Sequence, residues 1–152
     1  MSGTRKHIYQ IELPVSPERT FALLHTPSAI CDWWEASRAI VISKTGGVWV
    51  GAWGPEDEPD YISAATIECF DPPTKMRLVD FKYHARTGQL PFPTAALTTE
   101  FTVEPLTAGS LLRVVQDGFP ADAVADEFYK GCETGWQATF ENIRKYFLAK
   151  AL

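Results

Sequence analysis

The chain has 152 residues, the length of one ordinary globular domain, with a hydrophobic fraction of 45% and a charged fraction of 22%. Its formal net charge is −5 and its basic residues form no cluster, which argues against nucleic acid or an anionic membrane surface as a partner, because both need clustered Lys or Arg. No stretch approaches the ~20 apolar residues of a membrane-spanning helix, so we expect one domain over residues 1–152 and no membrane span.

The first quarter of the chain predicts one strand and two short helices. Residues 7–13 alternate with a period of two, which is typical of a strand. Ser16 is placed to cap a helix whose first residue is Pro17, and this helix is expected to end before Pro27, because the residue before a proline disfavours helical backbone. A second short helix is predicted over Ser28–Trp33, with the serine as its cap.

The middle of the chain predicts a series of strands connected by short turns. These strands cover residues 38–43, 48–53, 60–70, 75–83, 94–104 and 110–117. Short connections favour an antiparallel meander. Residues 84–93 form the longest irregular segment and are a candidate lid over one end of a cavity. Residues 118–120, with the sequence Gly-Phe-Pro, are expected to end the last strand.

The C-terminal residues 122–152 predict one long amphipathic helix. Its apolar or small positions recur at steps of three and four residues, and they are Phe128, Cys132, Trp136, Thr139, Ile143 and Phe147. Such a helix after a run of strands needs a sheet to lie on, because its apolar face cannot stay in water. We therefore expect an open sheet that grips the helix, with a ligand site between the two.

Several short motifs occur along the chain in a distinctive order. They are Pro17, Glu18 and Phe21; Pro27 before Trp33 and Trp34; Gly46, Gly47 and Trp49; Asp71, Pro72 and Pro73; Glu100 and Phe101; Gly118 and Phe119; and Gly135 and Trp136. In this order they resemble the activator of heat shock protein ninety ATPase homologue family (single-domain type). That family is part of the START-like, or SRPBCC, polyketide-cyclase-like superfamily. The resemblance covers nearly the whole chain.

The resemblance implies a single START-like domain with an α+β helix-grip fold. In that fold a curved antiparallel sheet of six to seven strands wraps around the long C-terminal helix, two short helices follow the first strand, and a cavity lies between sheet and helix. The superfamily includes chaperone activators, carriers of hydrophobic ligands and cyclases. The eukaryotic chaperone activators carry a separate N-terminal domain, for which this chain has no room, so we place a chaperone role second.

The candidate ligand-binding residues are mostly aromatic side chains expected near the cavity: Trp34, Trp49, Trp53, Tyr61, Phe81, Tyr83, His84, Phe101, Phe128, Tyr129, Cys132 and Trp136. Aromatic residues often line concave pockets, although core packing also explains them. Gly51, between two tryptophans, leaves a dent for sheet curvature or for a ligand. Gly135 either leaves space for a ligand or lets the helix approach the sheet, and close packing is the favoured interpretation.

The cysteines and the chain start favour a cytoplasmic protein. The three cysteines are far apart and form no CxxC, so free thiols in a reducing compartment are expected. The polar residues 1–6 are not followed by the apolar segment of a signal peptide.

Catalytic motifs do not occur in the sequence: it contains no HExxH, no GxSxG and no phosphate-binding loop. No metal, cofactor or catalytic residue is therefore predicted. We expect a protein that binds a hydrophobic or aromatic small molecule without covalent chemistry. Two alternatives stay open: a chaperone-ATPase-activator-like stress-response module, and a cyclase- or hydrolase-like enzyme. Chaperone contact and homodimer formation also stay open, and the first residues to test for an enzyme are Tyr83, His84, Glu100 and Tyr129.

Overall fold

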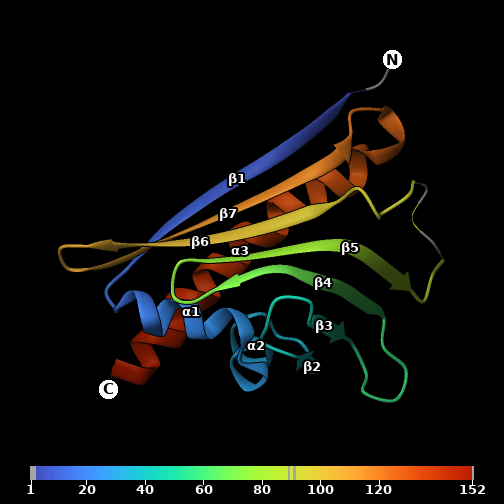
Figure 1. Ribbon diagram of the computed structural model, residues 1–152. Helices are drawn as coiled ribbons and strands as arrows, with labels where there is room; N and C mark the ends of the chain where they lie inside the picture. The colour runs from blue at the N-terminus through green and yellow to red at the C-terminus, as the bar shows by residue number, and fades with distance from the viewer. Residues whose placement is uncertain (1–2, 89, 91, 152) are drawn as a thin grey trace.

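The computed structural model describes residues 3–88, 90 and 92–151. Within them the chain forms an antiparallel sheet of 7 strands in the order β1-β7-β6-β5-β4-β3-β2, so that β1 and β2 form its two edges (Figure 1). The elements are β1 (Thr4–Leu13), α1 (Pro17–His25), α2 (Pro27–Trp33), β2 (Arg38–Val41), β3 (Val48–Trp53), β4 (Tyr61–Asp71), β5 (Lys75–Ala85), β6 (Thr98–Leu106), β7 (Gly109–Pro120), a 3-10 turn (Ala123–Ala125) and α3 (Asp126–Ala151). This architecture confirms the predicted helix-grip fold.

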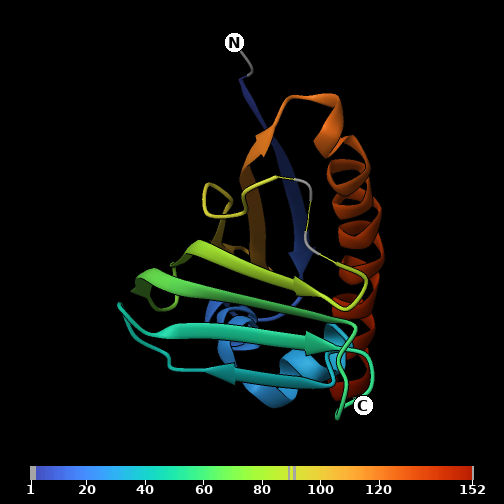
Figure 2. The same ribbon diagram turned by 90° about the vertical axis from the view of Figure 1, so that its right-hand side faces the viewer.

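The sheet curves strongly, and α3 runs along its inner side with α1 and α2 beside its C-terminal half (Figure 2). The buried face of α3 has the predicted helical spacing, with Trp136, Thr139, Ile143 and Phe147 at most 7% exposed. They face a core built from alternate residues of the strands and from the two short helices. The second half of α3 is therefore held by the core. Among the described residues, no helix combines the length and apolar character needed to span a membrane.

The start of α1 confirms the predicted cap, while the start of α2 does not. Ser16 Oγ accepts a hydrogen bond from the backbone N–H of Arg19 at 3.3 Å, and Pro17 is the first helical residue. The second helix begins at Pro27 with Thr26 at the cap position, so the expected cap at Ser28 was wrong. The Thr26 hydroxyl donates to the carbonyl of Ala22 at 2.6 Å, and it therefore closes α1.

The start of β6 and the end of β7 differ from the prediction for identifiable reasons. Strand β6 begins at Thr98 because residues 94–97 form a turn, closed by a 3.0 Å hydrogen bond from Leu97 N to Thr94 O. Strand β7 continues through residues 118–120, where Phe119 and Pro120 pair with β1. Gly118 has φ +89° at a register shift between the two strands, so it accommodates a bulge instead of ending the strand.

Further differences lie near the segment between β5 and β6, at the start of α3 and at strand ends elsewhere: β1 begins at Thr4 and not at residue 7, and β2 ends at Val41 and not at residue 43. Strand β5 extends to Ala85, so part of the expected loop 84–93 is strand. The lid expected there includes residues 89 and 91, which lie outside the described part of the chain. Helix α3 begins at Asp126, after the 3-10 turn, and not at residue 122.

Candidate functional site

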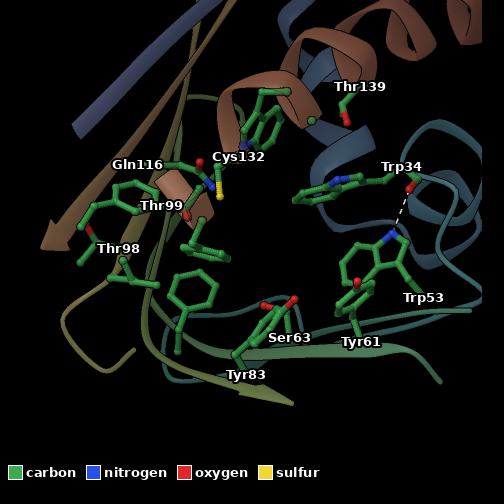
Figure 3. Close-up of a pocket in the computed structure, with 16 residues that line it drawn as sticks. Trp34, Trp53, Tyr61, Ser63, Tyr83, Thr98, Thr99, Gln116, Cys132 and Thr139 are labelled. Carbon is green, nitrogen blue, oxygen red and sulfur yellow. Dashed lines mark hydrogen bonds between the residues drawn. The ribbon is translucent and has the colours of Figure 1, made fainter. Parts of the chain in front are cut away.

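A pocket of about 410 Å³ lies between the inner face of the sheet and the first half of α3 (Figure 3). Its walls come from β3 to β7, from α3 and from Trp34, the residue that follows α2. This volume falls within the roughly 300–1,000 Å³ of small-molecule sites in proteins. The pocket is the place between sheet and helix where a ligand can be held.

Most of the sequence-predicted site residues lie on the pocket wall. They are Trp34, Trp53, Tyr61, Phe81, Tyr83, Phe128, Cys132 and Trp136. Phe81 and Tyr83 share one face of β5 because strand side chains alternate. Phe128, Cys132 and Trp136 follow one another at intervals of four residues, which places them on one side of α3.

Trp49 and Phe101 are core residues behind the wall. Trp49 is 2% exposed, and its indole N–H donates to the carbonyl of Leu24 at 3.1 Å. Phe101 is 1% exposed, with its ring 6.2 Å from that of Trp136. The expected dent at Gly51 is filled, because an added Cβ would lie 2.7 Å from the ring of Trp53 and 3.2 Å from that of Trp49. These residues shape the pocket from behind.

His84 does not line the pocket, because it alternates with Tyr83 on β5 and is exposed on the other face. Tyr129 follows Phe128 on the helix and so points about 100° away from it. Its ring stacks on His7 of β1 at 3.7 Å, and its hydroxyl donates to the carbonyl of Lys6 at 2.8 Å. Tyr129 therefore fastens α3 to β1.

Trp34 is the centre of a tryptophan cluster at one end of the pocket. Its ring lies 4.9 Å from Trp33, 5.3 Å from Trp49, 5.6 Å from Trp53 and 5.0 Å from Trp136. The indole N–H of Trp53 donates to the carbonyl of Trp34 at 2.9 Å, as the dashed line in Figure 3 shows. The cluster gives this end of the pocket a rigid aromatic wall.

Several lining residues were not singled out from the sequence as ligand contacts. They are Ser63, Leu97, Thr98, Thr99, Gln116, Phe119 and Thr139. Thr99 and Gln116 are opposite each other in the β6–β7 register. Because side chains alternate along a strand, the apolar residues of β6 and β7 indicate that Thr99 and Gln116 are on the inward face. The sequence does not show the pairing between the two strands that places these residues opposite each other.

Gly135 also lines the pocket, and its structure does not fit the favoured interpretation of close packing. A Cβ added there would meet nothing within 4 Å. The missing side chain therefore leaves open space beside the pocket. Gly131, one turn earlier on α3, has equally open surroundings but does not line the pocket.

The pocket lining carries no ionised side chain. Within the described part of the chain, its lining residues include no Asp, Glu, His, Lys or Arg. Burial raises the pKa of the Tyr83 hydroxyl to about 12, with smaller effects of Tyr61 and Cys132, and burial also raises the pKa of the Cys132 thiol to about 12. Both groups are therefore protonated at neutral pH. The described residues also contain no group of three His, Cys, Asp or Glu placed to hold a metal ion.

The residues named as first enzyme candidates do not converge. Tyr83 lines the pocket, whereas His84 and Tyr129 lie outside it. Glu100 forms ion pairs with Lys75 at 3.2 Å and with Arg77 at 3.5 Å, away from the pocket lining. These four residues therefore form no shared catalytic arrangement.

Comparisons with solved structures show the same fold in proteins of low sequence identity. A protein from Mesorhizobium loti has 18% identity and a TM-score of 0.75, with 97% of this chain and 100% of that chain covered. An AHSA1-like protein from Aeromonas hydrophila has 15% identity and a TM-score of 0.71, with coverages of 97% and 94%. The Aha1 dimer from Colwellia psychrerythraea has 13% identity and a TM-score of 0.70, with coverages of 92% and 93%.

The search of curated proteins finds no match. A family model, by contrast, matches residues 14–148, which is most of the chain. The matched segment begins directly after β1, extends into the last turns of α3 and so includes every residue that lines the pocket. The chain belongs to the family described as activator of Hsp90 ATPase homolog 1-like proteins.

Proposed function

We propose that this protein binds an apolar, aromatic small molecule in the pocket between the sheet and α3, without covalent chemistry. The observation that carries the proposal is a ligand-sized pocket walled by aromatic rings. Aromatic walls favour a flat apolar molecule, because ring stacking and apolar burial both stabilise it there. The lining offers no group that titrates near neutral pH, so binding is favoured over acid–base catalysis.

The binding proposal is tested by filling the pocket from α3. Gly135→Leu places a side chain in the open space beside the pocket, whereas Gly131→Leu makes the same change one turn away, off the lining. Both changes favour the helix by a similar amount, so stability effects are matched. With 2-methylnaphthalene as the probe, we expect Gly135→Leu to weaken binding by about tenfold or more and Gly131→Leu to leave it unchanged.

Isothermal titration calorimetry and ligand-dependent thermal shifts measure this binding. The proposal fails if the unaltered chain binds no apolar ring compound, or if both leucine variants bind 2-methylnaphthalene as the unaltered chain does. Native mass spectrometry of protein freshly purified from its own host then identifies a co-purifying molecule.

A second candidate function is activation of a chaperone ATPase, which the family description favours. It is tested by adding the protein at high micromolar concentration to an Hsp90 chaperone and measuring ATP hydrolysis. If the Gly135→Leu variant still stimulates ATP hydrolysis, the chaperone role does not depend on ligand binding in the pocket. No stimulation would count against it.

A further inference from the structure

The inner wall of the pocket carries a polar side chain with an unmet hydrogen-bonding requirement. Gln116 lies on β7 between Thr99 of β6 and His7 of β1, its register partners on either side. Its amide end and Cys132 of α3 point toward one another in Figure 3. Among the described residues, the buried Gln116 Oε1 has no hydrogen-bond partner. Buried acceptors are nearly always paired, so an orphan on a pocket wall indicates a partner that arrives with a ligand.

A second buried oxygen without a partner, Tyr9 Oη, belongs to the neighbouring strand β1. Tyr9 pairs in register with Val114 and does not line the pocket. Gln116 is therefore the member of this pair whose side chain lines the pocket.

The surroundings of Gln116 exclude a charged partner. Thr99 and Cys132 beside it are neutral, and no described lining residue can balance an ion. His7, its neighbour on β1, does not line the pocket, and its ring is already engaged by Tyr129: Nε2 lies 2.8 Å from the carbonyl oxygen of Tyr129, and the two rings stack. The described ion pair closest to this end of α3 joins Arg5 and Asp126 at 2.6 Å, on the β1 side and off the lining. An unpaired charge placed among aromatic rings would lose its hydration without compensation.

We propose that the ligand is an uncharged ring compound that carries a hydroxyl group, and that this hydroxyl binds the amide of Gln116. A hydroxyl both donates and accepts, so it can donate to Oε1 or accept from the amide N–H₂, whichever end of the amide faces it. A carbonyl alone can only accept, and a methyl group can do neither. Gln116 is then a specificity-determining residue. This inference rests on the proposed binding function.

Three naphthalenes of similar size test the inference. At pH 7, 2-naphthol is neutral and carries a hydroxyl, 2-methylnaphthalene carries a methyl group instead, and 2-naphthoate carries a negative charge. Dissociation constants are measured by isothermal titration calorimetry for the unaltered chain, for Gln116→Met and for Gln10→Met. Methionine keeps the length of glutamine without its hydrogen bonds. Gln10→Met is the matched control, because it makes the same change on a strand, at an exposed position of β1 that does not line the pocket.

The expected result is a change in preference and not only in affinity. Gln116→Met should reduce the preference for 2-naphthol over 2-methylnaphthalene by about fivefold, the effect of one lost hydrogen bond. Gln10→Met should leave that preference unchanged. The unaltered chain should bind 2-naphthoate about a hundredfold or more weaker than 2-naphthol. The comparison of 2-naphthoate with 2-naphthol uses only the unaltered chain, so it does not depend on whether a variant folds.

The outcomes separate the two proposals. Equal effects of Gln116→Met on 2-naphthol and 2-methylnaphthalene, or equally tight binding of 2-naphthoate, would overturn the inference and leave the binding function standing. Binding of none of the three compounds would overturn both. The melting temperature of Gln116→Met serves as the folding control, and it should not fall, because the substitution removes an unpaired buried acceptor.

Discussion

At the scale of single residues, Glu35 has a backbone conformation that disfavours its side chain. It follows Trp34, the C-terminal cap of α2, and has φ 59°, in the left-handed region that favours glycine. We expect Glu35→Gly to increase the free energy of unfolding by about 0.5–1 kcal/mol, because it removes the clash of Cβ with the backbone. Urea denaturation measures the change.

Glu133 supplies the control for this substitution. It is exposed within α3, where glycine should instead lower the free energy of unfolding by about 1 kcal/mol. If Glu35→Gly lowers the free energy of unfolding as Glu133→Gly does, the backbone at Glu35 is not strained.

The residue scale also shows which part of the site a sequence can predict. Most of the aromatic lining residues could be predicted, because their size and their spacing on β5 and α3 place them toward the helix–sheet contact, whereas Phe119 of β7 was not predicted. Alternation places Thr99 on the strand face of the buried Phe101, and Gln116 on that of the buried Val114, but it does not indicate whether this part of the face meets the core or a pocket. His84 and Tyr129 were expected at the site because of their chemistry, and alternation and helix geometry direct them elsewhere.

At the scale of elements, the start of α1 depends on one side chain. Ser16 Oγ satisfies a backbone N–H that the helix cannot satisfy internally. We expect Ser16→Ala to lower the free energy of unfolding by about 1 kcal/mol. Ser28→Ala is the matched control: Ser28 is exposed inside α2, whose cap is Thr26, so its removal should change stability by less than about 0.5 kcal/mol.

Chemical denaturation of both variants measures these differences. A larger loss in Ser28→Ala than in Ser16→Ala would mean that the capping assignment is reversed.

The types and order of the elements were predictable because each has a local signal: a period of two, a period of 3.6, or a proline or serine at an end. Boundaries that depend on distant segments were not. Strand β7 continues past Gly118 because β1 is there to pair with it, and an added Cβ at Gly118 would lie 2.0 Å from the carbonyl oxygen of Ala96. In the sequence alone, Gly118 and Pro120 suggest that the strand ends there. Only the pairing with β1 shows that the strand continues and that Gly118 lies at a bulge.

At the scale of the whole molecule, α3 divides into two parts. Its second half supplies buried core residues such as Ile143 and Phe147, whereas its first half supplies half-buried pocket residues such as Phe128 and Cys132. The fold therefore holds the helix at one end and leaves the other end to line the pocket. A ligand in the pocket would supply the apolar contacts that this half otherwise lacks.

Cys132, in the pocket-lining half of α3, makes the free energy of unfolding depend on pH. Burial raises the pKa of its thiol from the ordinary 9.0 to about 12. Between these values the unfolded chain has released the thiol proton while the folded chain still holds it. The unfolded state then binds fewer protons, so the free energy of unfolding falls as pH rises through 9, by up to about 1.4 kcal/mol per pH unit for this group.

Urea denaturation of the unaltered chain and of Cys132→Ala at pH 8 and pH 10 isolates this effect. The alanine variant should lose less stability between the two pH values than the unaltered chain, by about 1 kcal/mol. At pH 8 the two proteins differ mainly through the lost side-chain contacts, so only the difference between pH values reports the thiol. Tyr83 adds a further loss above its ordinary pKa of 10.0, because burial raises its pKa in the same direction. Equal pH dependence in both proteins would mean that the thiol is hydrated in the folded state, and that the first half of α3 does not close over the pocket.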